Sequence, residues 1–266
     1  MKETDLDIYC VTNKRVEHLE GTPLKLVCVG KENLPDFYLR CNKDDNIYHK
    51  EQYYSELTFH YWFWKNRLNN EKDKWLGFCQ KRRIWTEKEI LFNKIKKNDV
   101  EKIMLKNSKK EWKNYEAIIC KPIDVFPVKK MKLIKRGFRS IIKDPSILFD
   151  VSKQSVLLHF DMHHGYGSLE KAIHCMNNKD KNNFYNYVKK STKFNPHIMY
   201  ISKPEILKKW FSDLFNWLER CETIFDKNML IGYDTGRLFA YLAERYASFW
   251  FKKYTKFYEQ PWAIVE

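Results

Sequence analysis

The feature that most restricts the fold of this chain is a series of short apolar runs that each end at a polar or glycine-containing loop. The runs, each with the loop that follows it, are Leu6–Val11 before Thr12-Asn13-Lys14, Leu24–Val29 before Gly30, and Trp75–Cys79 before Gln80-Lys81-Arg82-Arg83. Runs of this length predict buried strands. Because open α/β sheets bind ligands where their strands end, these loops are the first candidates for a site.

Apolar residues at helical spacing predict helices between and after these runs. One helix is predicted from Gln52 to Asn66, with a stripe that consists of Tyr54, Leu57, Thr58, Tyr61, Trp62 and Lys65. A second helix begins at Pro204, and its apolar positions are Ile206, Trp210, Leu214 and Leu218. A third, rich in aromatic residues, is predicted over Arg237–Phe251.

Two further runs complete the expected sheet. His197–Ser202 predicts a strand, whereas Ala117–Val125 contains Pro122 and therefore predicts an edge or bent strand. Strands alternate with helices first, and helices dominate later. This order favours an α/β sheet with a helical C-terminal part, and a length of 266 residues fits one large domain.

The charge of the chain points to an anionic partner. Lysine and arginine outnumber aspartate and glutamate by 49 to 34, which gives a net charge of +15. Nucleic acid, a phosphate-bearing ligand or an anionic membrane face would each suit such a chain. A lysine-rich composition that only adds solvated charge is the alternative. Hydrophobic residues make up 44% of the chain, which is enough for a substantial core and excludes a disordered protein.

The cysteines and the N-terminal segment indicate a reducing compartment. The seven cysteines are scattered and never form a CxxC pair, so neither a disulfide framework nor a zinc site is predicted. Met1–Asp7 carries three acidic residues and no apolar core of a signal peptide. No apolar stretch reaches the ~18 residues that a transmembrane helix needs. We therefore expect a cytoplasmic protein, soluble or peripheral.

The segment Lys129–Lys143 combines positive charge with an apolar face. Its basic residues are Lys129, Lys130, Lys132, Lys135, Arg136, Arg139 and Lys143. The apolar residues Met131, Ile134, Phe138, Ile141 and Ile142 share one helical face. This pattern is typical of an interfacial helix on an anionic membrane surface. A helix that buries its apolar face in the core and solvates its basic face is the alternative.

Two segments carry a resemblance to a known family. The first contains Asp45-Asn46-Ile47, Ser55-Glu56-Leu57-Thr58 and Tyr61-Trp62-Phe63-Trp64-Lys65-Asn66, and the second is Gly77-Phe78-Cys79-Gln80-Lys81-Arg82-Arg83-Ile84-Trp85. They resemble the Glu-Leu-Thr, Tyr-Trp-x-Trp-Lys-Asn and Gly-Leu-Cys-His-Tyr-Arg-Arg-Tyr-Phe patterns of a capsular and exopolysaccharide biosynthesis glycosyltransferase family. That family's domain has mostly been labelled as of unknown function. Weaker matches are Val11-Thr12-Asn13-Lys14, His197–Glu219 and Ala243-Glu244-Arg245.

The resemblance implies a GT-A-like fold, an open nucleotide-sugar-binding sheet flanked by helices. It implies a glycosyltransferase that moves a sugar from a nucleotide-diphosphate sugar to a capsular, exopolysaccharide or lipopolysaccharide-type acceptor. We expect a single domain over 1–266, with a nucleotide-sugar-binding half over 1–127 and an acceptor or membrane-facing half over 128–266. The expected partners are the donor, a glycan or lipid-linked glycan acceptor and the anionic inner face of the membrane, and nucleic acid is not expected.

This chain departs from the family pattern at two places. Gln80-Lys81 stands where the family has His-Tyr, and Asn13 stands where the family has His. An amide does not titrate near neutral pH, so Gln80 cannot replace a proton-carrying histidine. Either the family histidine binds ligand, or this member has a changed activity.

The leaving diphosphate of a nucleotide sugar needs its charge neutralised. Many transferases of the implied fold use an Asp-x-Asp metal site, but here the strand ends in basic residues. Guanidinium groups bind phosphate in a bidentate manner, so we predict that Arg82 and Arg83 do part of the metal's work. A structural ion pair with Glu56 or Asp45 is the alternative. Mg²⁺ or Mn²⁺ on Asp44 and Asp45 is compatible with the sequence but not indicated by it.

Other predicted donor contacts follow the strands or precede the helix. Thr12, Asn13 and Lys14 are placed for the base and ribose, or form only a polar turn. The others are Asp45, Asn46, Lys50 and Glu56, with Glu56 binding sugar hydroxyls, positioning Arg82 or lying exposed on its helix. At most one of Trp62 and Trp64 is expected to stack on a sugar, because they lie on different faces.

The catalytic base is predicted from three titratable residues. Asp161 and His163 follow an apolar run, in a loop, and either is suited to accept the acceptor's proton. Glu244, in the C-terminal match, is the rival. A histidine pair satisfied by its loop remains the alternative for His163-His164.

Two function classes compete with transfer. A basic nucleic-acid-binding protein fits the charge, although no helix-turn-helix, RNA-recognition or zinc-finger pattern is present. A catalytically inactive member of the same fold fits the change at Gln80-Lys81. The sugar, the nucleotide and the stereochemical outcome do not follow from the sequence.

Overall fold

The structure is a computed structural model that describes residues 5–266. The chain divides into two compact units. Unit 1 contains residues up to Lys121 together with His197–Ser212 and Trp250–Glu266, and unit 2 contains Pro122–Pro196 and Asp213–Phe249. The units therefore interleave along the sequence. The predicted assignment of donor binding to 1–127 and acceptor binding to 128–266 stays a prediction.

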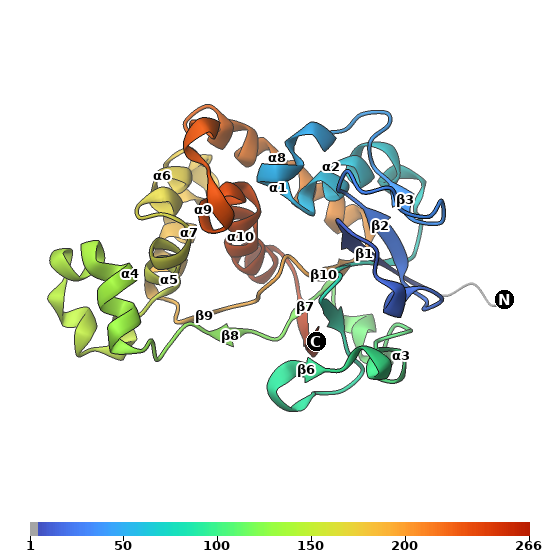
Figure 1. Cartoon of the computed structure of the whole chain (residues 1–266), viewed down its shortest axis with the longest axis horizontal. Helices are drawn as coiled ribbons and strands as arrows, with labels where there is room; N and C mark the ends of the chain where they lie inside the picture. The colour runs from blue at the N-terminus through green and yellow to red at the C-terminus, as the bar shows by residue number, and fades with distance from the viewer. Residues whose placement is uncertain (1–4) are drawn as a thin grey trace. The chain divides into compact units, whose positions relative to one another are not determined.

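Unit 1 is built on a mixed sheet whose main path has the order β11-β7-β10-β4-β1-β2-β3 (Figure 1). The bounds along this path are β11 Phe257–Gln260, β7 Ala117–Cys120, β10 Tyr200–Ser202, β4 Trp75–Gln80, β1 Leu6–Thr12, β2 Lys25–Cys28 and β3 Leu39–Arg40. Strand β1 pairs in parallel with both β2 and β4. Strands β5 Arg83–Trp85, β6 Lys94–Ile95 and β12 Trp262–Val265 extend the sheet off this path.

The sequence predicted most strands of this sheet correctly. Strands β1, β2, β4 and β10 all lie within or next to the predicted apolar runs. The prediction for Ala117–Val125 was wrong, because Pro122 divides it into β7 and a separate strand, β8 Ile123–Asp124. Strand β7 is not an edge strand, since it pairs with β10 on one side and β11 on the other.

The predicted helix over Gln52–Asn66 is interrupted. Helix α1 spans Glu51–Tyr54 and α2 spans Leu57–Asn66, with Ser55 between them at φ 49°. A positive φ in a residue other than glycine breaks helical geometry, which accounts for the interruption. The predicted stripe was also partly wrong, because Lys65 is exposed whereas Phe59 and Phe63 are fully buried.

Aromatic side chains fill the layer between α2 and the sheet. The ring centroids of Tyr9 and Phe63 lie 4.9 Å apart, and Phe78 of β4 lies 5.6 Å from Phe63. Gly77 of β4 is required within the sheet itself, because a Cβ there would lie 2.9 Å from Cγ1 of Ile201 on the paired strand β10. The sheet edge that carries the polar loops is therefore held by a rigid core.

Unit 2 is mostly helical. Its helices are α4 Lys130–Lys143, α5 Val156–His164, α6 Ser168–His174, α7 Asn178–Lys190 and α9 Gly232–Gly236, and it includes the C-terminal part of α8 Pro204–Glu222 and most of α10 Leu238–Tyr254. Strands β8 and β9 Lys193–Phe194 form a small second sheet. Helix α3 Val100–Ile103 belongs to unit 1. None of the helices within residues 5–266 combines the length and the apolar character that crossing a membrane would require.

Candidate functional site

The carboxyl ends of β1 and β4 bring two predicted loops together in unit 1. The chain leaves β1 toward β2 on one side and returns through β4 on the other, so the order of the sheet reverses between β1 and β4. This is the position at which open α/β sheets bind their ligands. The Lys81 ammonium donates a hydrogen bond to Oδ1 of Asn13, which ties the two loops to each other.

The turn after β1 is fixed by its own residues and by its neighbour. The buried Thr12 hydroxyl donates to the carbonyl of Lys14 at 2.6 Å, and the Lys14 amide donates back to Thr12 Oγ1 at 3.2 Å. Gly30, after β2, packs so closely that a Cβ would lie 2.8 Å from the Asn13 carbonyl oxygen. Tyr48 donates to the Gly30 carbonyl at 2.6 Å. The loop after β1 is therefore preorganised.

A cavity of about 640 Å³ opens beside these loops. It is lined by Lys14, Arg15, Val16, Glu17, His18, Lys81, Arg82, Lys97, Val265 and Glu266. Cationic side chains outnumber the two carboxylates, and Arg15 is itself held by Glu20 at 2.9 Å. A hollow lined by guanidinium and ammonium groups is suited to a diphosphate.

His18 adds an uncharged polar group to the cavity wall. Its Nε2 is buried and has no hydrogen-bond partner among residues 5–266. Burial lowers the pKa of His18, and the nearby Lys97 lowers it further. The ring is therefore neutral at physiological pH and can make one hydrogen bond to a ligand.

The two predicted phosphate-binding arginines diverge. Arg82 is exposed and lines the cavity, whereas Arg83 lies on the other side of the hairpin and donates to Gln80 Oε1 at 3.3 Å. Nε of Arg83 is buried without a partner in the part of the chain that the structure describes. Lys81, which was not among the predicted site residues, accompanies Arg82 in the cavity wall.

Glu56 contacts Gln80, and its predicted roles in binding sugar hydroxyls or in positioning Arg82 stay predictions. Gln80 Nε2 donates to a Glu56 carboxylate oxygen and also to the carbonyl of His197 at 2.9 Å. Gln80 therefore links Glu56 with Arg83 through its two amide ends. Gln80, which stands where the family has histidine, thus connects two other side chains and does not line the cavity.

The loop before α1 is held by local hydrogen bonds. The Asn46 side chain donates to the Asp44 carbonyl at 2.8 Å and accepts from the Tyr48 amide at 3.0 Å. The Asp45 carbonyl accepts from Asn66 at 2.8 Å. Lys50 lies over the Tyr54 ring at 5.8 Å. Their predicted roles in donor binding stay predictions, because none of these residues lines the cavity.

The neighbouring tryptophans have different environments, as expected. Trp62 is buried, and its indole N–H donates to the Lys43 carbonyl at 2.9 Å. Trp64 is half-buried, with the Lys65 ammonium 4.0 Å from its ring centroid. Trp62 is therefore a core residue, and only Trp64 has a face that could meet a ligand.

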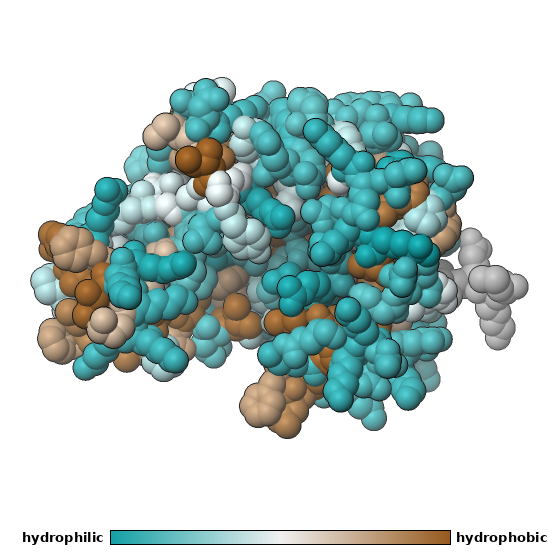
Figure 2. Space-filling view, in the orientation of Figure 1, coloured by the Kyte–Doolittle hydropathy of each residue, from teal (hydrophilic) through white to brown (hydrophobic). Residues whose placement is uncertain are grey.

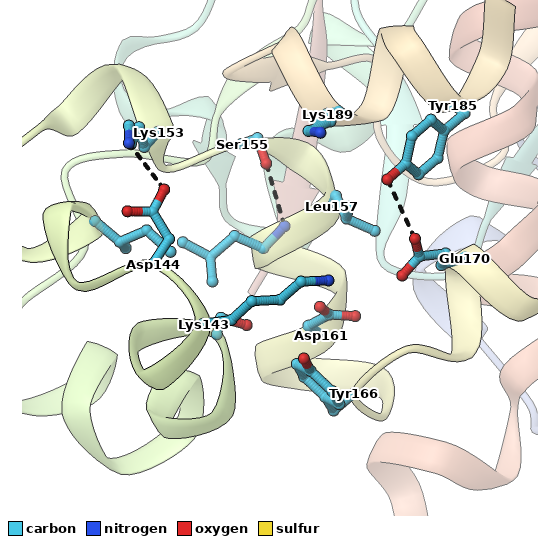
Figure 3. A pocket seen from close by; sticks show the side chains of 13 residues that line it. Lys143, Asp144, Lys153, Ser155, Leu157, Asp161, Tyr166, Glu170, Tyr185 and Lys189 are labelled. Atoms are coloured by element: carbon cyan, nitrogen blue, oxygen red, sulfur yellow. Dashed lines mark hydrogen bonds and ion pairs between the residues drawn. The ribbon is translucent and has the colours of Figure 1, made fainter. Parts of the chain in front are cut away.

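Unit 2 contains a second cavity, of about 520 Å³, around Asp161 (Figure 3). Its polar lining residues are Ser140, Lys143, Asp144, Lys153, Ser155, Asp161, Tyr166, Glu170, Tyr185 and Lys189. Tyr185 donates to Glu170 at 3.1 Å, and Lys153 donates to Asp144 at 2.8 Å. Paired carboxylates and tyrosines provide the hydrogen-bonding groups that sugar hydroxyls need.

Asp161 is a desolvated carboxyl in this cavity. Burial raises its pKa from 3.8 to about 6, and the Glu170 charge adds to this, while the Gly167 amide and Lys143 act in the opposite direction. The Gly167 N–H donates to Asp161 Oδ1 at 3.0 Å. Such a group is ionised at neutral pH and is basic enough to accept a proton.

The raised pKa of Asp161 predicts a pH-dependent stability effect. The folded state binds the Asp161 proton more tightly than the unfolded state does. Ionisation of this carboxyl therefore lowers the stability of the fold as the pH rises from 4 to 6, and the full loss is reached above pH 6. Asp161→Asn removes the charge and keeps the acceptor for Gly167. After a discount for partial exposure, we expect the variant to be more stable by about 1–2 kcal/mol at pH 7.5.

The difference in stability between Asp161→Asn and the wild type should disappear at pH 4. Urea denaturation of both proteins at pH 7.5 and at pH 4 measures it. Asp124→Asn, at an exposed position of unit 2, is the matched control and should leave the free energy of unfolding unchanged. A variant that is less stable than the wild type at pH 7.5 would contradict the desolvation of Asp161.

His163 lies on helix α5, so the prediction that this segment is a loop was wrong. Its Nδ1 faces the His159 carbonyl at 2.8 Å, and its ring stacks on His159 at 4.4 Å. Burial lowers the pKa of His163, and burial with the Arg245 charge lowers that of His159 to about 2. His163 is not a lining residue of the Asp161 cavity.

Glu244 forms an ion pair with its neighbour Arg245. The Arg245 side chain is only 1% exposed and that of Glu244 is 15% exposed. Arg245 also lies 4.0 Å from the Phe194 ring centroid and 3.2 Å from His159 Nδ1. Glu244 thus balances a buried charge, which the sequence did not indicate.

Several lining residues were missed at the sequence level. Arg15 and His18 approach the first cavity from the segment that follows Lys14, and Lys97 and Glu266 approach it from two distant segments that no sequence spacing connects to the first. Lys81 alone could have been found, because it lies between Gln80 and Arg82 in the matched segment. Among residues 5–266, no group of three or more His, Cys, Asp or Glu side chains is arranged to hold a metal ion.

Comparison with known proteins places this chain in a family. The family described as "Domain of unknown function (DUF4422)" matches residues 7–256. The chain belongs to this family. Membership of DUF4422 agrees with the resemblance to a domain of unknown function, whereas the individual motif matches stay predictions. No curated protein matches the chain.

One solved structure shares the fold of this DUF4422 member. The apo structure of the WbbM bifunctional glycosyltransferase superposes with a TM-score of 0.74 at 20% sequence identity. The match covers 98% of this chain and 45% of that chain, so this chain spans less than half of the WbbM length. The likeness confirms the predicted α/β sheet flanked by helices. At this identity it shows the fold alone.

Proposed function

We propose that this chain is a glycosyltransferase. It transfers a sugar from a nucleotide-diphosphate donor to a glycan acceptor of the capsular, exopolysaccharide or lipopolysaccharide type. The observation that carries the proposal is the cationic cavity at the carboxyl ends of β1 and β4, with Lys14, Lys81 and Arg82 in its wall. The fold shared with a glycosyltransferase structure supports it.

The donor's diphosphate is assigned to this cavity. Transfer breaks the bond between the anomeric carbon and the diphosphate, so negative charge develops on the leaving oxygen. Lys81 and Arg82 neutralise that charge, and the tight turn between β4 and β5 holds their backbone beside the cavity. Lys14 contacts the nucleoside from the preorganised loop after β1, whereas the predicted contacts of Thr12 and Asn13 stay predictions, because neither residue lines the cavity.

Transfer forms the new bond between a hydroxyl oxygen of the acceptor and the anomeric carbon, and the hydroxyl proton passes to a carboxylate. Asp161 suits this role best, because it lines a cavity and has a pKa of about 6. His163 faces the His159 carbonyl and Glu244 pairs with Arg245, so both are weaker candidates. The acceptor is a lipid-linked glycan, and the enzyme acts at the cytoplasmic face of the membrane.

Ligand-dependent stabilisation tests the proposal. Thermal unfolding is measured with nucleoside diphosphates and nucleotide sugars, with and without Mn²⁺. A ligand at about 100 times its dissociation constant should stabilise the fold by about 2.7 kcal/mol. Transfer or donor hydrolysis, followed by mass spectrometry, would exclude an inactive member of the fold. If no diphosphate stabilises the chain but a single-stranded oligonucleotide does, in a salt-sensitive manner, the nucleic-acid-binding alternative holds.

A further inference from the structure

Helix α4 carries two apolar stripes, of which only one is packed. Leu133 and Gly137 are buried, and Leu133 belongs to a core cluster with Ile147, Leu158 and Met162. The partly buried Ile141 packs against the same cluster. This stripe is sufficient to attach α4 to unit 2.

The second stripe of α4 faces solvent. Met131 is 65% exposed, Ile134 45%, Phe138 59% and Ile142 65%, and these residues recur at helical spacing. Just beyond the helix, Phe149 is 84% exposed. Figure 2 shows apolar side chains gathered over α4 and the turns that follow it. Single exposed apolar residues are common, but a continuous row of large ones marks an interaction surface.

The exposed stripe is bordered by positive charge. The basic side chains of α4 are Lys130, Lys132, Lys135, Arg136, Arg139 and Lys143, and all of them are exposed. The helix has no acidic residue. A protein partner with an acidic rim would meet a row of apolar side chains only if it carried a matching groove. A lipid surface provides anionic headgroups and an apolar interior along the whole helix.

We propose that α4 and Phe149 form a docking surface for an anionic lipid bilayer. Helix α4 lies parallel to the membrane, with Met131, Ile134, Phe138 and Ile142 inserted below the headgroups. The lysines and arginines on the adjoining side of the helix contact the lipid phosphates. The alternative in which α4 buries its whole apolar face in the core does not hold, because these four residues are exposed.

Vesicle sedimentation with the full chain tests this surface. Vesicles of phosphatidylcholine alone are compared with vesicles that also contain phosphatidylglycerol, at low and high salt. The wild type should sediment with the anionic vesicles and much less with the neutral ones. Higher salt should weaken the binding, because screening reduces the attraction of the exposed cations. Equal binding to both vesicles, or to neither, would overturn the proposal.

Two pairs of substitutions separate the apolar and the charged contributions. Phe138→Ser with Ile142→Ser, and Lys132→Glu with Lys135→Glu, should each weaken binding to anionic vesicles by about tenfold or more. Phe92→Ser, at an 82% exposed position in unit 1, is the apolar control, and Lys110→Glu with Lys113→Glu is the charge control. Both controls should bind as the wild type does.

A partner other than a lipid bilayer on the exposed stripe of α4 would give different results in these experiments. If the stripe is an interface with a second copy, the wild type will form a concentration-dependent dimer that the Phe138 and Ile142 pair abolishes, and vesicle binding will be absent. Either finding overturns lipid docking. All variants sit on exposed residues, so folding should be preserved. Stabilisation by nucleoside diphosphates should be unchanged in them, which keeps this test separate from that of the proposed reaction.

Discussion

Replacement of Arg82 by alanine is expected to weaken the binding of a nucleoside diphosphate by about 10- to 100-fold. A hydrogen bond to a charged group contributes about 1.5–3 kcal/mol, and every 1.4 kcal/mol corresponds to a tenfold change in affinity. Arg82 lines the cationic cavity and is exposed, so its loss should leave the fold intact. Isothermal titration calorimetry on the folded variant measures the effect.

Two further variants show whether charge or geometry matters at this position. Arg82→Lys keeps the charge but loses the planar fork that binds phosphate in a bidentate manner, so it should recover only part of the affinity. Lys113→Ala removes an exposed charge that lies outside the cavity and should have no effect. If Arg82→Ala binds the diphosphate as tightly as the wild type, the cavity is not the donor site.

Glu244→Gln is expected to destabilise the fold by about 3 kcal/mol. Arg245 is 1% exposed and keeps its charge permanently, so removal of the carboxylate leaves a buried cation without its charge partner. Guanidinium denaturation monitored by tryptophan fluorescence measures the free energy of unfolding. Activity lost in this variant would therefore not by itself identify a catalytic base.

A double variant distinguishes the structural role from a catalytic one. Glu244→Leu with Arg245→Met replaces the ion pair by apolar side chains and should restore most of the stability. Glu219→Gln, at an exposed position of α8, should change the free energy of unfolding by less than about 0.5 kcal/mol. A fully stable Glu244→Gln protein without activity would argue against the ion-pair role and for Glu244 as the base.

The sheet could be predicted because its strands are continuous apolar runs. Leu6–Val11 and Trp75–Cys79 are buried on both faces, so each appears as a mostly apolar stretch, which only Asp7 interrupts with a charge. The break between α1 and α2 could not be predicted, since Ser55 is no strong helix breaker and nothing in the sequence around it marks its positive φ. Similarly, the strand pairing of β7 depends on Phe257–Gln260, which lies far along the chain.

Residues of the candidate site could be predicted only where they lie in a loop that directly follows a predicted strand. Arg82 and Asn13 come from loops that directly follow strands, and the parallel pairing of β1 with β4 brings these loops together. His18 and Lys97 reach the cavity through short helical turns whose positions depend on the whole fold. Asp161 was predicted as a titratable group in a loop, but only the structure shows that it is a desolvated carboxyl on a helix.

The order of the strands in unit 1 has a consequence for protein synthesis on the ribosome. Strand β10 lies between β4 and β7, and β11 and β12 are made from the last residues of the chain. The central sheet therefore cannot close until β10 has been made, and β4 waits with an open edge while residues 81–199 are synthesised. A nascent chain with an open edge is prone to aggregate, so this fold is expected to depend on chaperones during expression.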